Sequence, residues 1–454
     1  MVNSNNQMGK VKQQKERTFL QDLLNFQGSL NGKSKFLDEV RLKGAEEVRN
    51  IPFPTKKLED WKFISLRDLY KDSYELASDL DVDVPDISEH YLPESKGARL
   101  TFINGSFSAE HSSTEDIPEE VLIGNIAKLA EEDNDLLKEH LNKYVENNFE
   151  EDVFSSFNKA FLKDGVFVYV PEGLTVDVPL HLLFVQTDAD TNYFTTSRSV
   201  VVADKESEVT VVEDHIGLGD NKYFNLPVVE VNAEEESYVK HTKIQRDSRE
   251  AIHIARTAAF VHHHANYESY TITRGAKLSR NEPRISQRDE EVEFTVDGLV
   301  LIDGDQVSDT HSVMDHRFSH CESHQLHKCV ITGKAHSVFN GKIFVRKDAQ
   351  KIDSFQENRN LLLSRKGLVN TKPQLEIFAD DVVCTHGATV GQLEQDELFY
   401  LMSRGLNEQQ AREMLIYAFA LETIENITVD SVQDLLVDEV HRFTENQLDS
   451  ELTV

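Results

Sequence analysis

Alternation of apolar and polar residues over more than two hundred positions is the feature that most limits what this chain can fold into. From about residue 164 to residue 390, stretches such as "GVFVYVPEG", "LPVVEVNAEEESYVKHTKI" and "GLVLIDGD" alternate with polar turns. A period of two is typical of β-strands. Strand-turn-strand units recur, mostly at steps of roughly thirty residues, as in the stacked coils of a β-solenoid. They lie near Val168, Val201, Val229, Val300 and Ile331. The gap after Val229 is long, so a β-sandwich stays open as an alternative.

Helical patterns flank this strand region. The stretch "NIAKLAEEDNDLLKEHLNKYV" precedes it, and "EQDELFYLMSRG" follows it and ends at Gly405. Asn407 is a typical N-cap for the next helix, with Gln410 at its third helical position. An apolar stripe is expected along that helix, at Ala411, Met414, Leu415, Ala418, Phe419 and Leu421. We therefore expect an N-terminal mainly helical module at 1–150, a β-rich core at 151–392 and a C-terminal helical module at 393–454.

Composition excludes several classes of partner. The formal net charge of −32 argues against nucleic acid or an anionic membrane surface as a partner. Three cysteines form no disulfide framework and suit a reducing compartment. The N-terminal residues contain no apolar signal-peptide region, and no run is long enough to span a bilayer. These features predict a cytoplasmic protein.

The stretch "DHRFSHCESHQLHKC" places six His and Cys side chains within fifteen residues, from His316 to Cys329. Structural zinc sites usually show paired short spacings of Cys or His, and no C-x₂₋₄-C spacing occurs here. On a strand, one face would carry His327, Cys329 and Ile331, and the other His324, Leu326 and Lys328. An ordinary strand is favoured over a metal site, and the triplet His262, His263 and His264 is interpreted in the same way.

A thiol and an imidazole stand close together in "LEIFADDVVCTHGATVGQL". If this stretch is a strand, Asp380, Val382, Cys384 and His386 share a face. Two soft or borderline ligands cannot complete a metal site. Nearby acidic residues are expected to raise the pKa of the thiol rather than activate it.

Residues from about 308 to 425 resemble the SufB/SufD family of iron-sulfur cluster assembly proteins. The segments that carry the resemblance are "HKCVITGKAHSVFNGKIFVRKDAQKIDSFQENRNLLLS", "TKPQLEIFADDVVCTHGATVGQL" and "LFYLMSRG", and "KKLEDWKF" around Trp61 is also similar. The resemblance implies a right-handed parallel β-helix core flanked by helical modules. It also implies a non-enzymatic subunit of a scaffold complex, which pairs with SufB through the β-helix and binds the SufC ATPase through its C-terminal helices.

The resemblance also implies roles for particular residues. His386 in "CTHG" matches the family histidine that is a ligand of a nascent iron-sulfur cluster shared with SufB, with Cys384 beside it. This cluster would be transient, with none held tightly by the isolated chain. The expected SufC contacts are Leu398, Phe399, Leu401, Met414, Leu415, Ala418 and Phe419.

The segment 358–364, "NRNLLLS", contains no thiol where the SufB pattern has its sulfur-accepting cysteine, which favours the SufD branch. Two enzyme classes stay open beside this interpretation. One is a metal-dependent β-helix enzyme that uses the His/Cys-rich segment. The other is a polysaccharide-acting β-helix enzyme that uses Asp380 and Asp381. A homodimer of the isolated chain is a further expectation.

Overall fold

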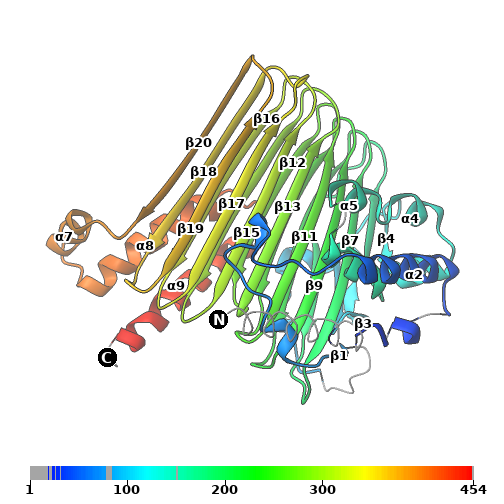
Figure 1. Ribbon diagram of the computed structural model, residues 1–454, viewed down its shortest axis with the longest axis horizontal. Coiled ribbons are helices and arrows are strands. Elements are labelled where there is room, and N and C mark those ends of the chain that lie inside the picture. Colours follow the sequence, from blue (N-terminus) through cyan, green and yellow to red (C-terminus); the bar gives the residue numbers. More distant parts are fainter. Residues whose placement is uncertain are drawn as a thin grey trace, which may run out of the picture.

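The computed structural model describes residues 32–77, 84–149 and 152–451, together with Phe19 and the stretches 23–25 and 27–30, with side chains described as far as Glu445. From β5 to β20 the chain winds through a β-solenoid of about eight turns, placing odd-numbered strands in one sheet and even-numbered strands in another (Figure 1). We call these sheets A and B. Every solenoid strand from β5 onwards pairs in parallel with the strand two positions away. This pairing confirms the predicted parallel β-helix and overturns the β-sandwich alternative.

Sheet A consists of β4 (Leu122–Asn125), β5 (Gly165–Val170), β7 (Tyr193–Ala203), β9 (Tyr223–Ala233), β11 (Ile252–Val261), β13 (Leu278–Gln287), β15 (Val307–His316), β17 (His336–Val345) and β19 (Leu368–Ile377), with β1 (Glu75–Leu76) beside β7. Sheet B consists of β3 (Ser106–Ser113), β2 (Arg99–Ile103), β6 (Leu180–Gln186), β8 (Glu208–Gly217), β10 (Tyr238–Arg246), β12 (Asn266–Arg274), β14 (Glu293–Ile302), β16 (Glu322–Ile331), β18 (Ile352–Leu362) and β20 (Val382–Gly391). The long sequence gap after Val229 is therefore filled by ordinary coils.

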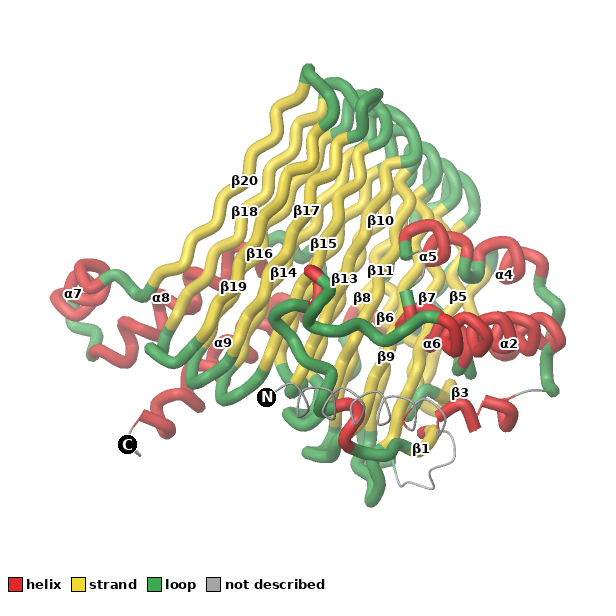
Figure 2. The backbone as a smooth tube through the Cα atoms, viewed as in Figure 1, coloured by secondary structure: helices red, strands yellow, loops and turns green. Residues whose placement is uncertain are grey.

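Helices cover parts of both outer faces (Figure 2). Near the N-terminal end of sheet A lie α2 (Lys35–Asn50), α3 (Ile126–Glu131), α4 (Asp135–His140), α5 (Lys143–Asn148) and α6 (Val153–Ala160). At the other end are α7 (Gln395–Ser403), α8 (Glu408–Ile424) and α9 (Asp430–Glu451), of which α8 packs on β14 and β16. Short 3₁₀ turns lie at Gly28–Leu30, Glu59–Trp61, Leu69–Lys71, Ser88–His90 and Pro93–Ser95. Among the described helices, none combines the length and apolar character needed to cross a bilayer.

The division expected at residue 150 does not coincide with the edge of the sheets. Strands β2, β3 and β4 precede that residue, and β2 pairs with β6 while β4 pairs with β5. Residues 1–18 of the expected N-terminal module lie outside the described residues. The first coils therefore recruit strands from the N-terminal part of the chain, whereas β20 ends at Gly391 and the C-terminal helices follow directly.

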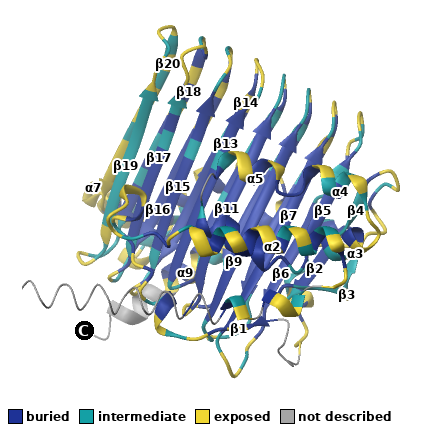
Figure 3. Ribbon diagram, turned by 45° about the vertical axis from the view of Figure 1, so that its right-hand side comes forward, coloured by how far each residue is buried: buried dark blue, intermediate teal, exposed yellow. Residues whose placement is uncertain are grey.

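The core lies between the two sheets and continues onto their outer faces. Inward-facing residues from successive coils, such as Val168, Val201 and Val229, form one apolar cluster. A second cluster joins the outer face of sheet A to α2, α6 and Trp61, and a third joins sheet B to α8 and α9. Burial is nearly complete in the middle coils and falls in the last one (Figure 3). The side chains of the final coil are therefore accessible to other molecules, unlike those of the middle coils.

Candidate functional site

The last coil of the solenoid has two free sheet edges. In the described part of the chain, β19 pairs only with β17, and β20 pairs only with β18. A free parallel edge presents unpaired backbone N–H and C=O groups, and proteins usually cover or charge such edges. The last coil instead exposes apolar side chains. Val383 on β20 is 63% exposed, Leu368 on β19 is 58% exposed, and Phe378, directly after β19, is 59% exposed. This edge has the properties of an interface that another chain covers.

Cys384 and His386 lie on β20 at positions that face into the solenoid in every earlier coil. The strand register places Cys384 over Ser354 and His386 over Gln356, both of which are buried. Because no further coil follows, Cys384 is only half-buried and His386 is exposed. The two residues alternate along one strand, so they share a face as the sequence predicted. Asp380 lies before the strand begins, in the preceding turn.

The Cys384 thiol is protonated at neutral pH. Burial raises its pKa to about 11, and the carboxylate of Asp353 adds to that effect. The predicted direction is confirmed, although burial, rather than Asp380 or Asp381, is the main cause. Metal binding requires the thiolate. For Cys384 to act as a metal ligand, the bound cation would have to favour loss of the thiol proton.

The residues expected to bind SufC differ widely in exposure. Phe399 is 74% exposed, and Met414 and Ala418 are also exposed. Leu401, Leu415 and Phe419 are half-buried, whereas Leu398 is only 4% exposed. The buried stripe of α8 runs through a different set, Ala411, Ile416, Ala420, Thr423 and Ile424. The predicted stripe thus divides between a face on the solenoid and a face in solvent, while the Asn407–Gln410 capping box is present as predicted.

A buried lysine anchors α8 to sheet B. Lys328, on β16, donates to the Phe419 carbonyl at 2.8 Å and to the Glu422 carboxylate. Arg359, on β18, reaches the same carboxylate at 2.9 Å. Since β18 pairs directly with β20, this contact links α8 to the strand beside Cys384 and His386. No local pattern could predict this contact, because Lys328 and Glu422 lie far apart in the chain.

The His/Cys-rich segment is divided by the fold into separate buried pairs. His316, at the end of β15, contacts the Cys321 sulfur at 3.2 Å and Ser323 Oγ at 3.0 Å. Burial lowers the pKa of His316 to about 4 and raises that of Cys321 well above its ordinary value. His320 and His324 are exposed. One pair therefore consists of a neutral imidazole and a neutral thiol with satisfied polar atoms.

The second pair, His327 and Cys329, faces the interior from β16. His327 Nε2 contacts Thr310 Oγ1 at 3.0 Å, and Ser337 Oγ donates to the Cys329 sulfur at 3.2 Å. Burial lowers the pKa of His327 to about 3 and raises that of Cys329 to about 12. The predicted division of faces is confirmed, since His324 lies outside and His327 inside. Neutral groups with polar protein partners are what a core position requires.

Two family models together match nearly the whole chain. Residues 184–419 match the model described as "SUF system FeS cluster assembly, SufBD core domain", and residues 15–182 match "SufBD protein N-terminal region". The core match ends within α8, so it includes the last coil with Cys384 and His386.

The chain belongs to the SufBD family.

Curated relatives of this SufBD protein align over most of their length. A protein from Synechocystis sp., named as an iron-sulfur cluster assembly SufBD family protein, is 37% identical over 89% of this chain and 90% of its own length. The protein ABCI7, chloroplastic, from Arabidopsis thaliana is 29% identical, covering 88% of this chain and 84% of its own. The iron-sulfur cluster assembly protein SufD from Escherichia coli is 29% identical, covering 84% and 86%.

The sequence interpretation of this SufBD chain missed one cluster. Among the described residues, one group of three or more His, Cys, Asp or Glu has ligand atoms within 4.8 Å of one another: His263, His264 and Glu291. The sequence analysis interpreted the histidines as part of an ordinary strand, whereas they lie in the turn between β11 and β12. Their carboxylate partner lies one coil later in the chain, so no local spacing showed it. The solenoid period was the signal that could have found it. Within the part of the chain that the structure describes, Cys384 and His386 belong to no such group.

Proposed function

We propose that this SufBD chain is a SufD-type, non-enzymatic subunit of a scaffold complex that contains SufB and the SufC ATPase. SufB would cover the free edge of the last coil, and SufC would bind α7 and α8. The cargo is a nascent iron-sulfur cluster, held transiently between this chain and SufB. The single observation that supports this most strongly is the free edge that carries Cys384 and His386, which belong to no group of three ligands among the described residues.

Ligand number argues for a shared site. Iron-sulfur clusters are held by four Cys or His ligands. The last coil offers two, Cys384 and His386, so a partner must supply the others. The exposed apolar side chains of Val383 and Leu368 beside them suit a buried protein interface. SufB, with a β-helix of its own, is the partner that the family resemblance supplies. A second copy of this chain is the competing occupant.

The segment 358–364 supports SufD over SufB. Asn358 and Asn360 are buried there, and their side-chain amides hydrogen-bond to the His327 carbonyl at 2.9 Å and the Thr389 carbonyl at 3.0 Å. Neither residue can accept sulfur as a thiolate does. In this proposal, sulfur enters through SufB, and this chain completes the cluster site.

Exposed apolar side chains on α7 and α8 support SufC docking. Phe399, Tyr400, Met402 and Met414 are exposed, and aromatic and methionine side chains are enriched at protein interfaces. The contact of Glu422 with Lys328 and Arg359 joins α8 to β16 and β18. In this proposal, ATP hydrolysis by SufC moves α8, and that contact passes the movement to the strand next to His386.

A cytoplasmic location is part of the proposal. The three cysteines are all free in the structure, as in proteins of a reducing compartment. The Arabidopsis relative is named as chloroplastic, so the chloroplast is the alternative location.

Co-expression with SufB and SufC from the same source tests the complex. The assembly is purified through a tag on this chain, and its intact mass is measured. We expect one stable complex that contains all three proteins. Replacing Phe399 and Met414 by Ala should release SufC from the complex while SufB stays bound. A folded chain that binds neither partner, or only itself, would refute the proposal.

Replacing His386 tests the cluster site within that complex. His386→Ala should leave complex formation intact and reduce the yield of reconstituted cluster, measured by its visible absorption and iron content. His324→Ala is the matched control, since His324 is another exposed histidine of sheet B but lies on β16, away from the free edge. Equal yields from the two variants would remove His386 from the site.

A further inference from the structure

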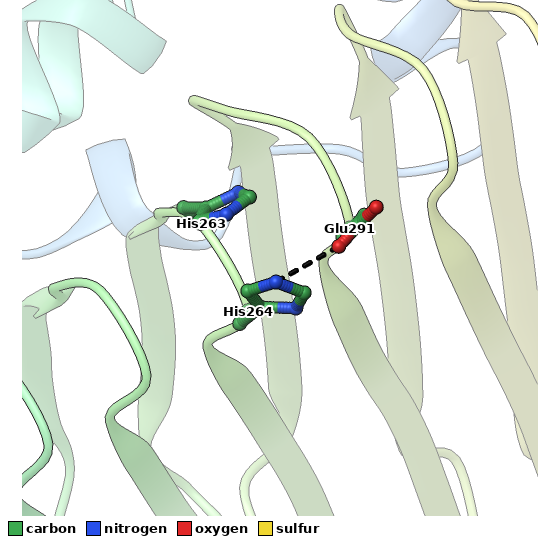
Figure 4. Close-up of side chains that lie close together, drawn as sticks. All are labelled: His263, His264 and Glu291. Atoms are coloured by element: carbon green, nitrogen blue, oxygen red, sulfur yellow. Dashed lines mark ion pairs between the residues drawn. The ribbon is translucent and has the colours of Figure 1, made fainter.

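One corner of the solenoid carries three side chains that suit a metal ion. His263 and His264 lie in the turn between β11 and β12, and Glu291 lies in the next coil's turn, between β13 and β14. One potential ligand atom from each lies within 4.8 Å of the others. Figure 4 shows the imidazole of His264 directed at the Glu291 carboxylate, with Nε2 and Oε2 2.8 Å apart. The rings of His263 and His264 are close as well, with centroids 4.1 Å apart.

Backbone conformation brings these side chains together. His264 has φ +51° and Glu291 has φ +59°, both in the left-handed region that non-glycine residues rarely occupy. The equivalent corner residues of the flanking coils, Glu236 and His320, share this conformation, with φ +57° and +56°. The corner is therefore a repeated turn, and its side chains are stacked at the strand spacing of about 4.8 Å. The register of β12 and β14 thus places Glu291 beside His264.

His263 already makes the second contact typical of a metal-bound histidine. Its Nδ1 lies 3.0 Å from the Glu290 carbonyl oxygen. Metal-ligating histidines commonly donate their other ring N–H to a carbonyl, which fixes the tautomer and the ring orientation. Neither imidazole is deeply buried, so a hydrated ion can reach the group from solvent.

We propose that His263, His264 and Glu291 form a binding site for one divalent first-row transition-metal ion. Two imidazoles and one carboxylate are the ligand set of open Zn²⁺ sites and of facial Fe²⁺ sites, and both leave coordination positions for water or another ligand. The site is four strands of sheet B away from β20, on the order of 19 Å at the strand spacing, so it is separate from His386. It does not depend on SufB or SufC.

Cobalt titration of the purified full-length chain tests this site. We expect one equivalent of Co²⁺ to bind without thiolate-to-cobalt charge-transfer absorption, since the three ligands offer only nitrogen and oxygen. Binding at Cys384 would add that band and would count against the proposal. Loss of even an outer-shell partner weakens metal sites about 10–100-fold, so His264→Ala and Glu291→Gln should each cost at least that. Competition by Zn²⁺ should displace the cobalt from the wild-type chain.

His320→Ala is the matched control, because His320 is an exposed histidine at the same corner, one coil further on. It should bind Co²⁺ like the wild type. Circular dichroism of each variant establishes that it is folded, as expected for replacements of surface side chains. Because two ligand variants are tested independently, the proposal stays testable even if one of them does not fold. Equal affinity in the wild type and both ligand variants, or no stoichiometric binding by the wild type, would overturn the proposal.

Discussion

Replacing Glu422 by Gln should loosen α8 from the solenoid without unfolding the protein. The Lys328 side chain is only 1% exposed, and its ammonium group has two hydrogen-bond partners, the Phe419 carbonyl and the Glu422 carboxylate. Gln keeps an acceptor oxygen in the same place and removes the negative charge. The variant therefore isolates the electrostatic part of the contact that joins α8 to β16 and β18.

The expected cost follows from the two ion pairs that Glu422 makes. Gln keeps a hydrogen bond to the charged ammonium of Lys328 and removes only the attraction between the two charges. Ion pairs that are partly exposed contribute up to about 1 kcal/mol, so loss of the charge facing Lys328 costs about 1 kcal/mol. The second ion pair, between Glu422 and Arg359, is about half exposed to solvent. Its contribution to stability is therefore limited to about 0.5 kcal/mol. The sum of about 1–1.5 kcal/mol corresponds to a roughly five- to tenfold greater population of the open form.

Hydrogen exchange of the α8 amides measures that opening. We expect exchange in Glu408–Ile424 to accelerate by that factor while the middle strands of the solenoid are unchanged. Glu413→Gln is the matched control, since Glu413 lies on the same helix and accepts only a surface hydrogen bond from Gln409. If the two variants exchange at the same rate, Lys328 does not depend on the Glu422 charge, and the proposed link between α8 and β18 fails.

The same contact predicts a pH dependence. The hydrogen bond from Lys328 lowers the pKa of Glu422 below its ordinary value of 4.5. A carboxyl with a lowered pKa in the folded state stabilises that state above its unfolded pKa, and this stabilisation is lost as the pH falls through the folded pKa. The difference between the wild type and Glu422→Gln should therefore be full at neutral pH and disappear in acid.

Three further predictions concern other parts of the molecule. Cys384 should react with iodoacetamide roughly a hundredfold more slowly than a thiol of ordinary pKa at pH 8, because burial raises its pKa to about 11; the rate is followed by mass spectrometry. Val383→Lys should weaken binding of SufB in the pull-down, since it places a charge on the apolar edge, and should leave the melting temperature of the isolated chain unchanged. Glu230→Gln should lower the free energy of unfolding in urea by about 3–5 kcal/mol, because it leaves the Arg198 guanidinium buried without its carboxylate partner, 2.7 Å away.

Each of these has a control and a refuting result. Ordinary alkylation of Cys384 in the native chain would show that its thiol is not protected by burial. Leu42→Lys, at an exposed leucine on α2, should bind SufB normally. If both lysine variants lose SufB binding equally, the apolar edge is not the SufB interface. Glu235→Gln breaks an exposed pair with Lys205 and should leave the free energy of unfolding nearly unchanged. A similar cost for Glu230→Gln would mean that its buried pair adds little.

Local pattern was enough to predict the type of fold. The alternation around Val168 and Val201 indicates strands, and the Asn407–Gln410 capping box marks the start of α8, because both signals depend only on neighbouring residues. The same reasoning placed Cys384 and His386 on one strand face. It could not predict that β2 and β4 join the sheets, because their partners β6 and β5 lie beyond the expected limit at residue 150.

Short-range spacing along the chain was enough to predict the strands, the start of α8, the opposite faces of His324 and His327, and the family resemblance. Contacts between residues of different coils became known only from the folded chain. The folded chain places Glu291 against His264 and Glu422 against Lys328. It also places Cys384 and His386 on the last coil of the solenoid, where no further strand covers them. The physical reason is that solenoid contacts depend on the length of every coil between two residues, and those lengths vary from turn to turn along this chain.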